Sequence, residues 1–279
     1  MKVAPDLVHA EDLARARGGR LGSPIELARE TDSTNDDAKE GARRGAPHGA
    51  VWIAESQRRG RGRAGRRWES SAGENLLFSV LLRLTCPASR LSLVSLAAGL
   101  AVRDVVADVL GDDEAVLVKW PNDVLVRRTG DGRLRKIAGV LVESAMVGAR
   151  VDYVVVGIGL NVHARVLPPE LAELATSVAL ESDARGKSSS FDRGEILASV
   201  LARLDHDVEH VVARGLGIVH ARLARRDAMH GEAVASEDGS ICGVGAGIDA
   251  DGRLRVRLAD GTIVPVASGE VVWRKAVAT

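Results

Sequence analysis

The sequence predicts a mixed α+β domain followed by a small all-β module. Up to about residue 228, segments with apolar residues at helical spacing alternate with short runs of β-branched residues. From about residue 229 only short β-like runs remain, separated by closely spaced turn signals. These signals are Glu237-Asp238-Gly239, Asp249-Ala250-Asp251-Gly252, Ala259-Asp260-Gly261 and Ser268-Gly269. We therefore expect an N-terminal segment over residues 1–27, a mixed domain over 28–228, and a small barrel or sandwich over 229–279.

The first third of the chain predicts two helices and two strands. A short helix is expected around Ala10–Arg17. Asp32-Ser33-Thr34-Asn35 offers N-cap side chains before a helix over Asp36–Arg44, whose charges change from acidic to basic in the order that the helix dipole favours. Val51–Glu55 and Asn75–Leu84 have the residue types of strands.

The middle of the chain continues this alternation. Apolar spacing predicts a long helix over Ser92–Leu110, ending at Gly111. The remaining predicted strands are Ala115–Lys119, Ile137–Glu143 and Tyr153–Ile158, and the remaining predicted helices are Glu170–Leu180 and Arg193–Arg214. A polar stretch over residues 182–190 separates the last two helices.

Composition narrows the class of protein. The chain has 38 Lys and Arg against 38 Asp and Glu, so no overall field draws it to nucleic acid or to a membrane surface. Its two cysteines, Cys86 and Cys242, lack the spacing of a metal site or a disulfide framework. The first residues lack an apolar signal core, and no uncharged run reaches membrane-spanning length. We expect a soluble, cytoplasmic protein.

Residues 57–68 form the most distinctive segment, which we call the Arg/Gly loop. It holds six arginines and three glycines and ends at Trp68. Glycine permits close backbone approach, and arginine presents a fixed fork of donors to phosphate or carboxylate. Such a stretch is also found solvated or bound to RNA. Because the loop is short and lies between two predicted strands, we expect it to close over a discrete anion.

Three further segments carry polar or glycine-rich patterns at strand ends. Lys119-Trp120-Pro121-Asn122-Asp123 has the residues of a turn, although a turn alone does not require its lysine and tryptophan. Lys136 precedes Ala138-Gly139 at the start of a predicted strand. Gly157-Ile158-Gly159-Leu160-Asn161 lacks the third glycine of the dinucleotide fingerprint, which excludes a Rossmann site here.

Together and in this order, these segments resemble the biotin protein ligases. The matching positions are Asp32-Ser33-Thr34-Asn35, Gln57, Gly60-Arg61-Gly62-Arg63, Gly65-Arg66, Trp68, Lys119-Trp120-Pro121-Asn122-Asp123, Lys136, Ala138-Gly139 and Gly157-Ile158-Gly159-Leu160-Asn161. The similarity runs from about residue 28 to 274. It implies a class II synthetase-like α+β catalytic domain over 28–228, with a central mixed β-sheet and flanking helices, and a C-terminal SH3-like β-barrel. Residues 1–27 are too few for a winged helix, so we expect the monofunctional form that does not bind DNA.

The resemblance implies a reaction in two steps. Biotin's carboxylate attacks the α-phosphate of MgATP to give biotinyl-5′-AMP and pyrophosphate. A specific lysine of a biotin carboxyl carrier protein then takes the biotin, and AMP leaves. The implied cofactors are ATP and Mg²⁺, with biotin as substrate. The implied partner is the carrier protein, with no DNA or membrane, and the enzyme is expected as a monomer or a homodimer.

The resemblance also assigns roles to residues. The implied biotin-binding residues are Ser33, Thr34, Asn35, Gln57, Gly60, Arg61, Lys136 and Gly139. The implied ATP- or adenylate-binding residues are Arg63, Arg66, Trp68, Lys119, Asn122 and Asn161. Lys136, Arg61 and Asp123 are the implied catalytic residues, and Asp123 is also the implied Mg²⁺ ligand. Arg58 and Arg59 depart from the family pattern, and region 163–190 lacks a tryptophan to cover adenine.

Two alternatives stay open at this point. A lipoate or octanoate ligase or transferase has a similar catalytic fold, but we expect it to lack the combined Gly-Arg-Gly-Arg and Lys-Trp-Pro-Asn-Asp patterns. A nucleic-acid-binding protein would use the Arg/Gly loop on phosphates. The balanced charge and the 3% aromatic content disfavour this second alternative, because single-stranded nucleic acid is commonly bound by stacking on aromatic rings.

Overall fold

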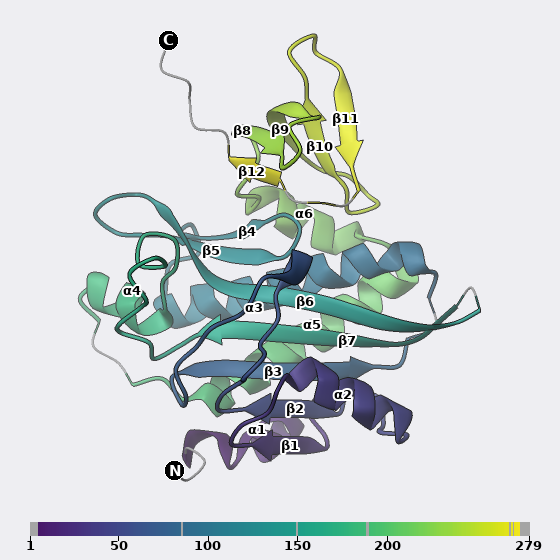
Figure 1. Ribbon diagram of the computed structural model, residues 1–279, viewed down its shortest axis with the longest axis vertical. Helices are drawn as coiled ribbons and strands as arrows, with labels where there is room; N and C mark the ends of the chain where they lie inside the picture. The colour runs from purple at the N-terminus through teal and green to yellow at the C-terminus, as the bar shows by residue number, and fades with distance from the viewer. Residues whose placement is uncertain are drawn as a thin grey trace.

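The computed structural model describes residues 5–84, 86–148, 150–187, 190–267, 269 and 271–273 (Figure 1). It contains a seven-stranded mixed sheet and a five-stranded antiparallel sheet. The predicted α+β fold with a C-terminal β module is therefore confirmed. Residues 1–4 of the predicted N-terminal segment, Ser268 of the last turn signal and residues 274–279 of the predicted module lie outside the described residues.

The helices and strands have the following bounds. The α-helices are α1 (Ala10–Ala16), α2 (Thr34–Arg43), α3 (Leu91–Leu110), α4 (Val178–Ala184), α5 (Arg193–Arg214) and α6 (Gly217–Arg225). The strands of the large sheet are β1 (Ile25–Ala28), β2 (Val51–Ala54), β3 (Asn75–Leu82), β4 (Val116–Lys119), β5 (Asp123–Arg127), β6 (Leu134–Val147) and β7 (Arg150–Asn161). Those of the small sheet are β8 (Ala233–Ser236), β9 (Cys242–Ile248), β10 (Leu254–Arg257), β11 (Ile263–Val266) and β12 (Val271–Trp273).

The large sheet has the strand order β1-β2-β3-β7-β6-β5-β4. Only β1 and β2 pair in parallel, and every other neighbouring pair is antiparallel. Its register aligns four residues in one row: Lys119 pairs with Asp123, Asp123 with Gly139, and Gly139 with Gly159. Because directly opposed residues point to the same face of a sheet, this row brings residues from four strands to one surface.

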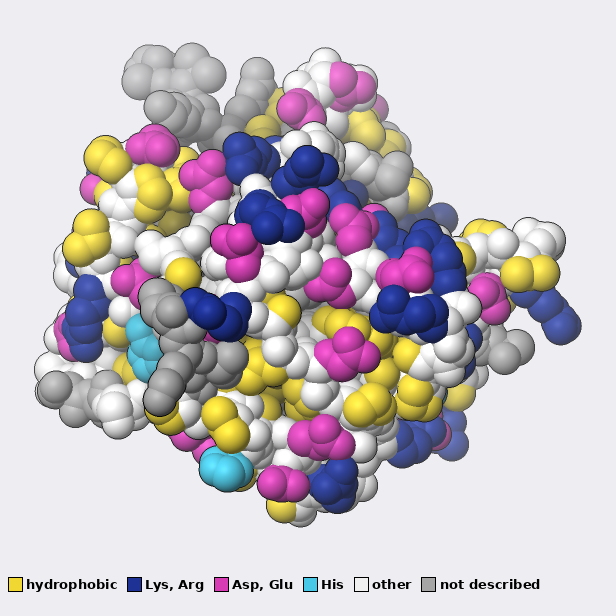
Figure 2. Space-filling view, turned by 60° about the horizontal axis from the view of Figure 1, so that its bottom comes forward, with side chains coloured by type: hydrophobic (Ala, Val, Ile, Leu, Met, Phe, Trp, Pro, Cys, Tyr) yellow, Lys and Arg dark blue, Asp and Glu magenta, His cyan; other side chains and the backbone are white. Residues whose placement is uncertain are grey.

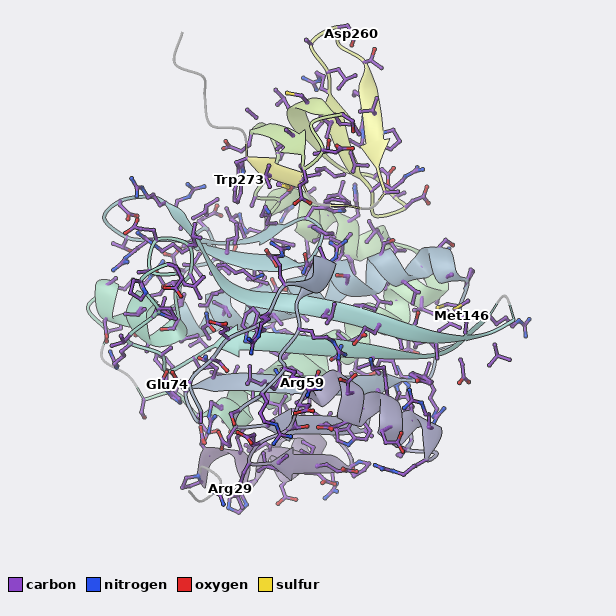
Figure 3. All side chains as sticks on the ribbon, in the orientation of Figure 1. Arg29, Arg59, Glu74, Met146, Asp260 and Trp273 are labelled. Carbon is purple, nitrogen blue, oxygen red and sulfur yellow. The ribbon has the colours of Figure 1, made fainter. Side chains whose placement is uncertain are left out.

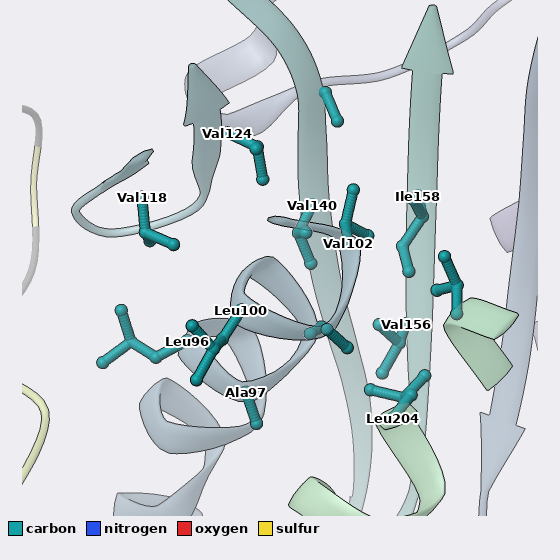
Figure 4. Packing of buried hydrophobic residues seen from close by; sticks show 14 of the residues in the cluster. Leu96, Ala97, Leu100, Val102, Val118, Val124, Val140, Val156, Ile158 and Leu204 are labelled. Atoms are coloured by element: carbon teal, nitrogen blue, oxygen red, sulfur yellow. The ribbon is translucent and has the colours of Figure 1, made fainter. Parts of the chain in front are cut away.

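Helices cover the two faces of this sheet unequally. On one face α3 and α5 pack on the strands and on each other (Figure 1). Figure 4 shows α3, which bears Ala97, Leu100 and Val102, beside β6 and β7, which bear Val140, Val156 and Ile158, and all six residues are buried. On the opposite face, α2 covers part of the sheet and the Arg/Gly loop crosses the rest. The alternation of strand side chains thus sends Val156 and Ile158 into the core and leaves Gly157 and Gly159 facing the loop.

Most of the predicted elements are confirmed, with shifts of a few residues at their ends. The helix α5 has the predicted bounds, and α3 ends at Gly111, whose φ of 63° suits glycine at this position. The helix α2 begins at Thr34, two residues before the predicted start, so Thr34 and Asn35 lie in its first turn. The short strands β1 and β5 and the helix α6 were not predicted.

The predicted helix over Glu170–Leu180 is wrong. Its first half forms turns after Pro168, whose carbonyl accepts from the backbone of Leu171. The chain then pairs with the start of β6, because Lys136 N donates to Leu174 O and Thr176 N donates to Lys136 O. These backbone bonds fix an extended segment, and a helix begins only at Val178.

The C-terminal module is joined to the large sheet through the β4–β5 hairpin. The indole Nε1 of Trp120, which is 2% exposed, donates to Gly252 O in the module at 2.9 Å. Lys119 Nζ lies 5.2 Å from the ring centre of Trp273 in β12, and Figure 3 labels this tryptophan at the base of the module. The hairpin that bears a sequence signature therefore also anchors the module.

The surface carries both charges side by side. Figure 2 shows Lys and Arg side chains interleaved with Asp and Glu over one face, in keeping with the net charge of zero. Among the described residues, no helix is both long and apolar enough to cross a membrane.

Candidate functional site

A cavity of about 120 Å³ lies between the Arg/Gly loop, the start of α2 and the open face of β6 and β7. Its wall is made of residues that are distant in the sequence. They are Ser33, Thr34, Asn35, Gln57, Arg61, Gly62, Arg63, Arg66, Arg67, Trp68, Asn122, Lys136, Gly139, Val140, Leu141, Gly157, Ile158 and Gly159. The structure thus brings together most of the residues that the sequence patterns single out.

Glycines form the floor of the cavity. Gly139 and Gly159 are directly opposed across β6 and β7, and Gly157 lies two residues further along β7. A Cβ atom at Gly157 would stand 2.1 Å from Asn35 Oδ1, and one at Gly159 would stand 2.5 Å from the ring of Trp68. Any side chain at these two positions would therefore collide with the cavity wall.

Trp68 and Lys136 meet above this floor. The Trp68 ring lies against Gly159 and Gly139, and Lys136 Nζ lies 5.4 Å from the centre of the same ring. Lys136 Nζ also lies 2.7 Å from Asp123 Oδ1. An ammonium group held between an aromatic face and a carboxylate is well fixed in position, which suits a cation that must meet a developing charge.

Neutral polar groups gather at the α2 end of the cavity. The side-chain oxygen of Gln57 accepts from Thr34 N at 2.8 Å. Ser79 of β3, which is fully buried, reaches Thr34 Oγ1 at 2.8 Å and Asn35 Oδ1 at 2.6 Å. Hydroxyl and amide groups can both donate and accept, so this end suits a neutral ligand with donors and acceptors of its own.

Arg61 is held by two carboxylates at the edge of the cavity. Its Nη1 lies 2.5 Å from Asp36 Oδ2, and its Nη2 lies 2.9 Å from Glu143 Oε2. The hydrogen bond from Arg61 lowers the pKa of Asp36 to about 2. Burial raises the pKa of Glu143, but the bonds from Asn35, Lys39 and Arg61 together lower it more, so the net shift is downward. All three groups are therefore charged at neutral pH.

The opposite end of the cavity is cationic. Arg63 Nη1 approaches Asn122 Oδ1 at 3.5 Å, and burial lowers the pKa of Arg63. Arg66 and Lys136 line the same end. Positive side chains that converge beside a carboxylate, Asp123, are suited to phosphate groups that bring a metal ion with them.

Four predicted site residues do not line the cavity. Gly60 lies in the stem of the loop, where its carbonyl accepts from Trp68 N at 3.0 Å. Asp123 is paired with Lys136, which does line the cavity. Lys119 is covered by Trp273, and burial lowers its pKa. Asn161 is 7% exposed and donates to Thr176 O at 2.9 Å, so its amide is used in holding the chain beyond β7.

Arg58 and Arg59 lie outside the cavity and tie down the stem of the loop. Arg58 contacts Asp32 at 2.7 Å and Glu30 at 3.0 Å, and Arg59 lies 3.8 Å from Asp32. Figure 3 labels Arg59 on the segment that crosses the open face of the sheet. The two arginines that depart from the family pattern thus pair with acids just before α2.

Ser79, Glu143 and Asp36 contact predicted site residues but are missed by sequence reasoning. Ser79 and Glu143 are single polar residues within strand-like runs, and Asp36 has the normal position of an acid in the first turn of a helix. The one available signal is the polarity of Ser79 among apolar neighbours in a strand that proves to be buried throughout.

Comparison with known proteins places this geometry in a family. Residues 27–161 match the model of the biotin/lipoate A/B protein ligase family, and residues 231–274 match that of the biotin protein ligase C-terminal domain. A biotin–[acetyl-CoA-carboxylase] ligase from Mycobacterium tuberculosis is 34% identical over 255 residues, which cover 89% of this chain and 88% of that protein. The chain belongs to the biotin protein ligase family.

Other biotin protein ligases agree in fold and differ in length. The structure of the Aquifex aeolicus biotin protein ligase in complex with biotin and ATP has a TM-score of 0.74 and 28% identity, and the match covers 91% of this chain and all of that one. The bifunctional ligase/repressor of Bacillus subtilis is 33% identical over 171 residues. That match covers 61% of this chain and 49% of the relative, so it spans about half of the relative's length.

Replacing Gly157 with alanine is expected to weaken ligand binding strongly. The new methyl group would meet Asn35 Oδ1 at 2.1 Å and push the first turn of α2 away from the sheet. Overpacking of this kind costs about 1–3 kcal/mol of stability. Where this cost falls on the liganded state, the affinity drops roughly 5- to 150-fold. Isothermal titration with biotin measures the effect. Gly99→Ala is the control, because a methyl group there meets Val118 at an ordinary 3.7 Å. Equal affinity in both variants would contradict a glycine floor.

Acid is expected to release the network around Arg61. The folded-state pKa of Asp36 is about 2 against an ordinary 3.8, so its contribution to stability is present above about pH 4 and is lost as the pH falls towards 2. Because its side chain is 44% exposed, we expect a contribution on the order of 1 kcal/mol. Urea unfolding at pH 6 and pH 3 measures it. The Asp36→Asn variant should lose less stability than the parent over this range, and an identical loss would refute the assignment.

Proposed function

We propose that this chain is an ATP-dependent biotin–protein ligase that forms biotinyl-5′-AMP and transfers biotin to a lysine of a carrier protein. One observation supports this most strongly. A glycine-floored cavity with a neutral polar end and a cationic end is closed by an arginine loop and holds Lys136 beside Asp123. The two ends match a ligand whose ring is neutral and whose tail becomes bonded to a phosphate.

The α2 end is proposed to bind the ring of biotin. Ser33, Thr34 and Gln57 can donate to and accept from its ureido group, while the glycine floor admits its apolar body. The Aquifex aeolicus structure is a complex with biotin and ATP, which supports biotin as the ligand of this cavity. Asn35 is proposed to act mainly by fixing the network beneath the ring, because its side chain already bonds Glu143 and Ser79.

The cationic end is proposed to carry the chemistry of the first step. A carboxylate oxygen of biotin attacks the α-phosphorus of ATP, the bond to the β-phosphate breaks, and pyrophosphate leaves. Lys136, with Arg63 and Arg66 nearby, would stabilise the charge that develops on the α-phosphoryl oxygens. Closure of the loop over the cavity would then exclude water and protect the mixed anhydride from hydrolysis.

The side chains at this end fit a magnesium ion that arrives with the nucleotide. Such ions commonly use one or two protein carboxylates together with phosphate oxygens. Asp123 would supply the carboxylate and Asn122 an amide oxygen. Within the described residues, no group of three or more His, Cys, Asp or Glu side chains could hold a metal without the nucleotide. When bound, the ion would neutralise phosphate charge.

The second step is proposed to use a carrier protein. The amine of the acceptor lysine attacks the acyl carbon of biotinyl-AMP, an amide bond forms, and AMP leaves with the loss of a proton from the amine. A biotin carboxyl carrier protein is the proposed partner. A reducing cytoplasm, which suits the thiols of Cys86 and Cys242, is the proposed location. The relative from Mycobacterium tuberculosis, named as a ligase of acetyl-CoA carboxylase, supports this choice.

Transfer of biotin to a purified carrier domain, followed by mass spectrometry, tests the proposal. With ATP, Mg²⁺ and biotin, the carrier should gain one biotinyl group on one lysine. Omission of ATP should abolish the gain. Pyrophosphate exchange separates the alternative: exchange stimulated by lipoate or octanoate but not by biotin would overturn the proposal in favour of a lipoate-type ligase.

A further inference from the structure

Glu143 connects three segments that meet at the mouth of the cavity. It lies on β6 and accepts from Asn35 Nδ2 at 2.7 Å and Lys39 Nζ at 3.0 Å, both on α2. It also accepts from Arg61 Nη2, on the Arg/Gly loop, at 2.9 Å. Its side chain is 29% exposed, so these charge-assisted bonds are partly shielded from water and stronger than those of an open surface pair.

The charge of Arg61 is already neutralised by the protein. Asp36 takes both Nη atoms, at 2.5 and 2.8 Å, and Glu143 shares Nη2. Counting Lys39, which bridges Asp36 and Glu143 at 2.8 and 3.0 Å, the group has two positive and two negative charges. A cation with two carboxylate partners has little attraction left for a third anion.

Arg63 presents the opposite case. Among the described residues no carboxylate lies within ion-pair distance of its guanidinium, and its side-chain bond is a long one to Asn122. Burial lowers the pKa of Arg63, and the attraction of Asp123 offsets this only in part. An anion placed beside Arg63 would therefore gain more than one placed beside Arg61.

We propose that Asp36 and Glu143 form a latch that holds the Arg/Gly loop over the cavity through Arg61. Arg61 is then a positioning residue, and Arg63 and Lys136 are the cations that meet the ligand. Asn35 connects the latch to the ring end of the cavity, because its Oδ1 accepts from Ser79, which also reaches Thr34. Ligand binding at that end would thereby support loop closure. The identity of the ligand in this inference rests on the proposed function, whereas the contacts of the latch do not.

The variant Glu143→Gln tests the latch, with Glu30→Gln as the matched control. Both remove one acid that pairs with a loop arginine, but Glu30 is 52% exposed and contacts Arg58 in the stem. Trypsin cleaves after arginine, so cleavage within residues 58–67 reports opening of the loop. We expect cleavage of the Glu143→Gln variant to be about tenfold faster than that of the parent, which corresponds to 1.4 kcal/mol. The control should change less than twofold. Equal cleavage in both variants would overturn the latch.

Kinetics separate positioning from general damage. For Glu143→Gln we expect the KM for biotin and the leakage of biotinyl-AMP to rise several-fold more than kcat for adenylation falls. An equal fall in kcat and rise in KM, with a lower melting temperature, would indicate a merely structural role. Glu143→Asp, which keeps the charge, should recover part of the retention of biotinyl-AMP.

A double-mutant cycle tests the role of Arg61. If Arg61 acts through the latch, Arg61→Gln and Glu143→Gln together should change KM little more than either alone. Additive effects would show that Arg61 meets the ligand directly and would contradict the proposal. If the parent forms no biotinyl-AMP at all, the proposed function fails, while the cleavage rates still decide whether the latch exists.

Discussion

The Lys136→Ala variant is expected to lose about 10²- to 10³-fold in the rate of biotinyl-AMP formation, the loss typical of removing one donor to a developing oxyanion. The ammonium group lies 2.7 Å from Asp123 and over the Trp68 ring, so no neighbouring lysine can replace it without moving both contacts. Pyrophosphate exchange at saturating biotin and ATP measures the rate. Circular dichroism should show an unchanged fold, because the side chain is 32% exposed.

Two further variants serve as controls for the effect of Lys136→Ala. Lys136→Arg keeps the charge but changes its shape, and should recover part of the rate. Arg59→Ala removes a cation of the loop whose side chain is 82% exposed, and should leave exchange within twofold of the parent. Exchange by Lys136→Ala at the parent's rate would remove this lysine from the proposed mechanism.

The Arg193→Ala variant is expected to lose about 3–5 kcal/mol of stability, as is usual when one partner of a buried ion pair is removed. Arg193 begins α5 with its side chain 1% exposed. It contacts the buried Glu55 at 2.8 Å, Asp6 at 2.9 Å and the backbone oxygen of Asn75 at 3.0 Å. One guanidinium thus joins α5, the residue after β2, β3 and the chain before α1.

Urea unfolding followed by circular dichroism measures this loss. Arg203→Ala is the control on the same helix, since Arg203 is 40% exposed and its partner Asp108 is 67% exposed. The control should lose less than about 1 kcal/mol. A loss of similar size in both variants would mean that burial of the Arg193 pair adds nothing.

The sequence predicted which residues line the cavity better than it predicted the directions of their side chains. Segments 57–68 and 119–123 and the glycines of β7 could be identified because their residue types are unusual for solvated strands and helices. The directions of Lys119 and Asn161 could not, because each depends on a contact made by a distant segment. For Lys119 this segment is β12, and for Asn161 it is the chain at Thr176.

Local patterns were also insufficient where tertiary pairing decides the backbone. The apolar spacing of Glu170–Leu180 favours a helix, yet bonds to Lys136 extend the chain at Leu174–Thr176. Similarly, Asp123 has the residue type of a turn but is the first residue of β5. Glu143 carried no signal in the sequence, because its importance arises only from side chains of α2 and of the Arg/Gly loop that reach it in the folded chain.

The indole of Trp120 bears on how the chain can be divided. Near residue 229 the sequence changes from mixed helical and strand patterns to short β-like runs, which suggests two separable units. A truncated variant would therefore be designed to end there. Yet the carbonyl that satisfies this buried indole belongs to Gly252, beyond that point. Truncation there would remove the contacts of the module with the β4–β5 hairpin, which holds Asp123 against Lys136. We therefore expect that a piece of this chain folds with its site intact only when it includes both sheets.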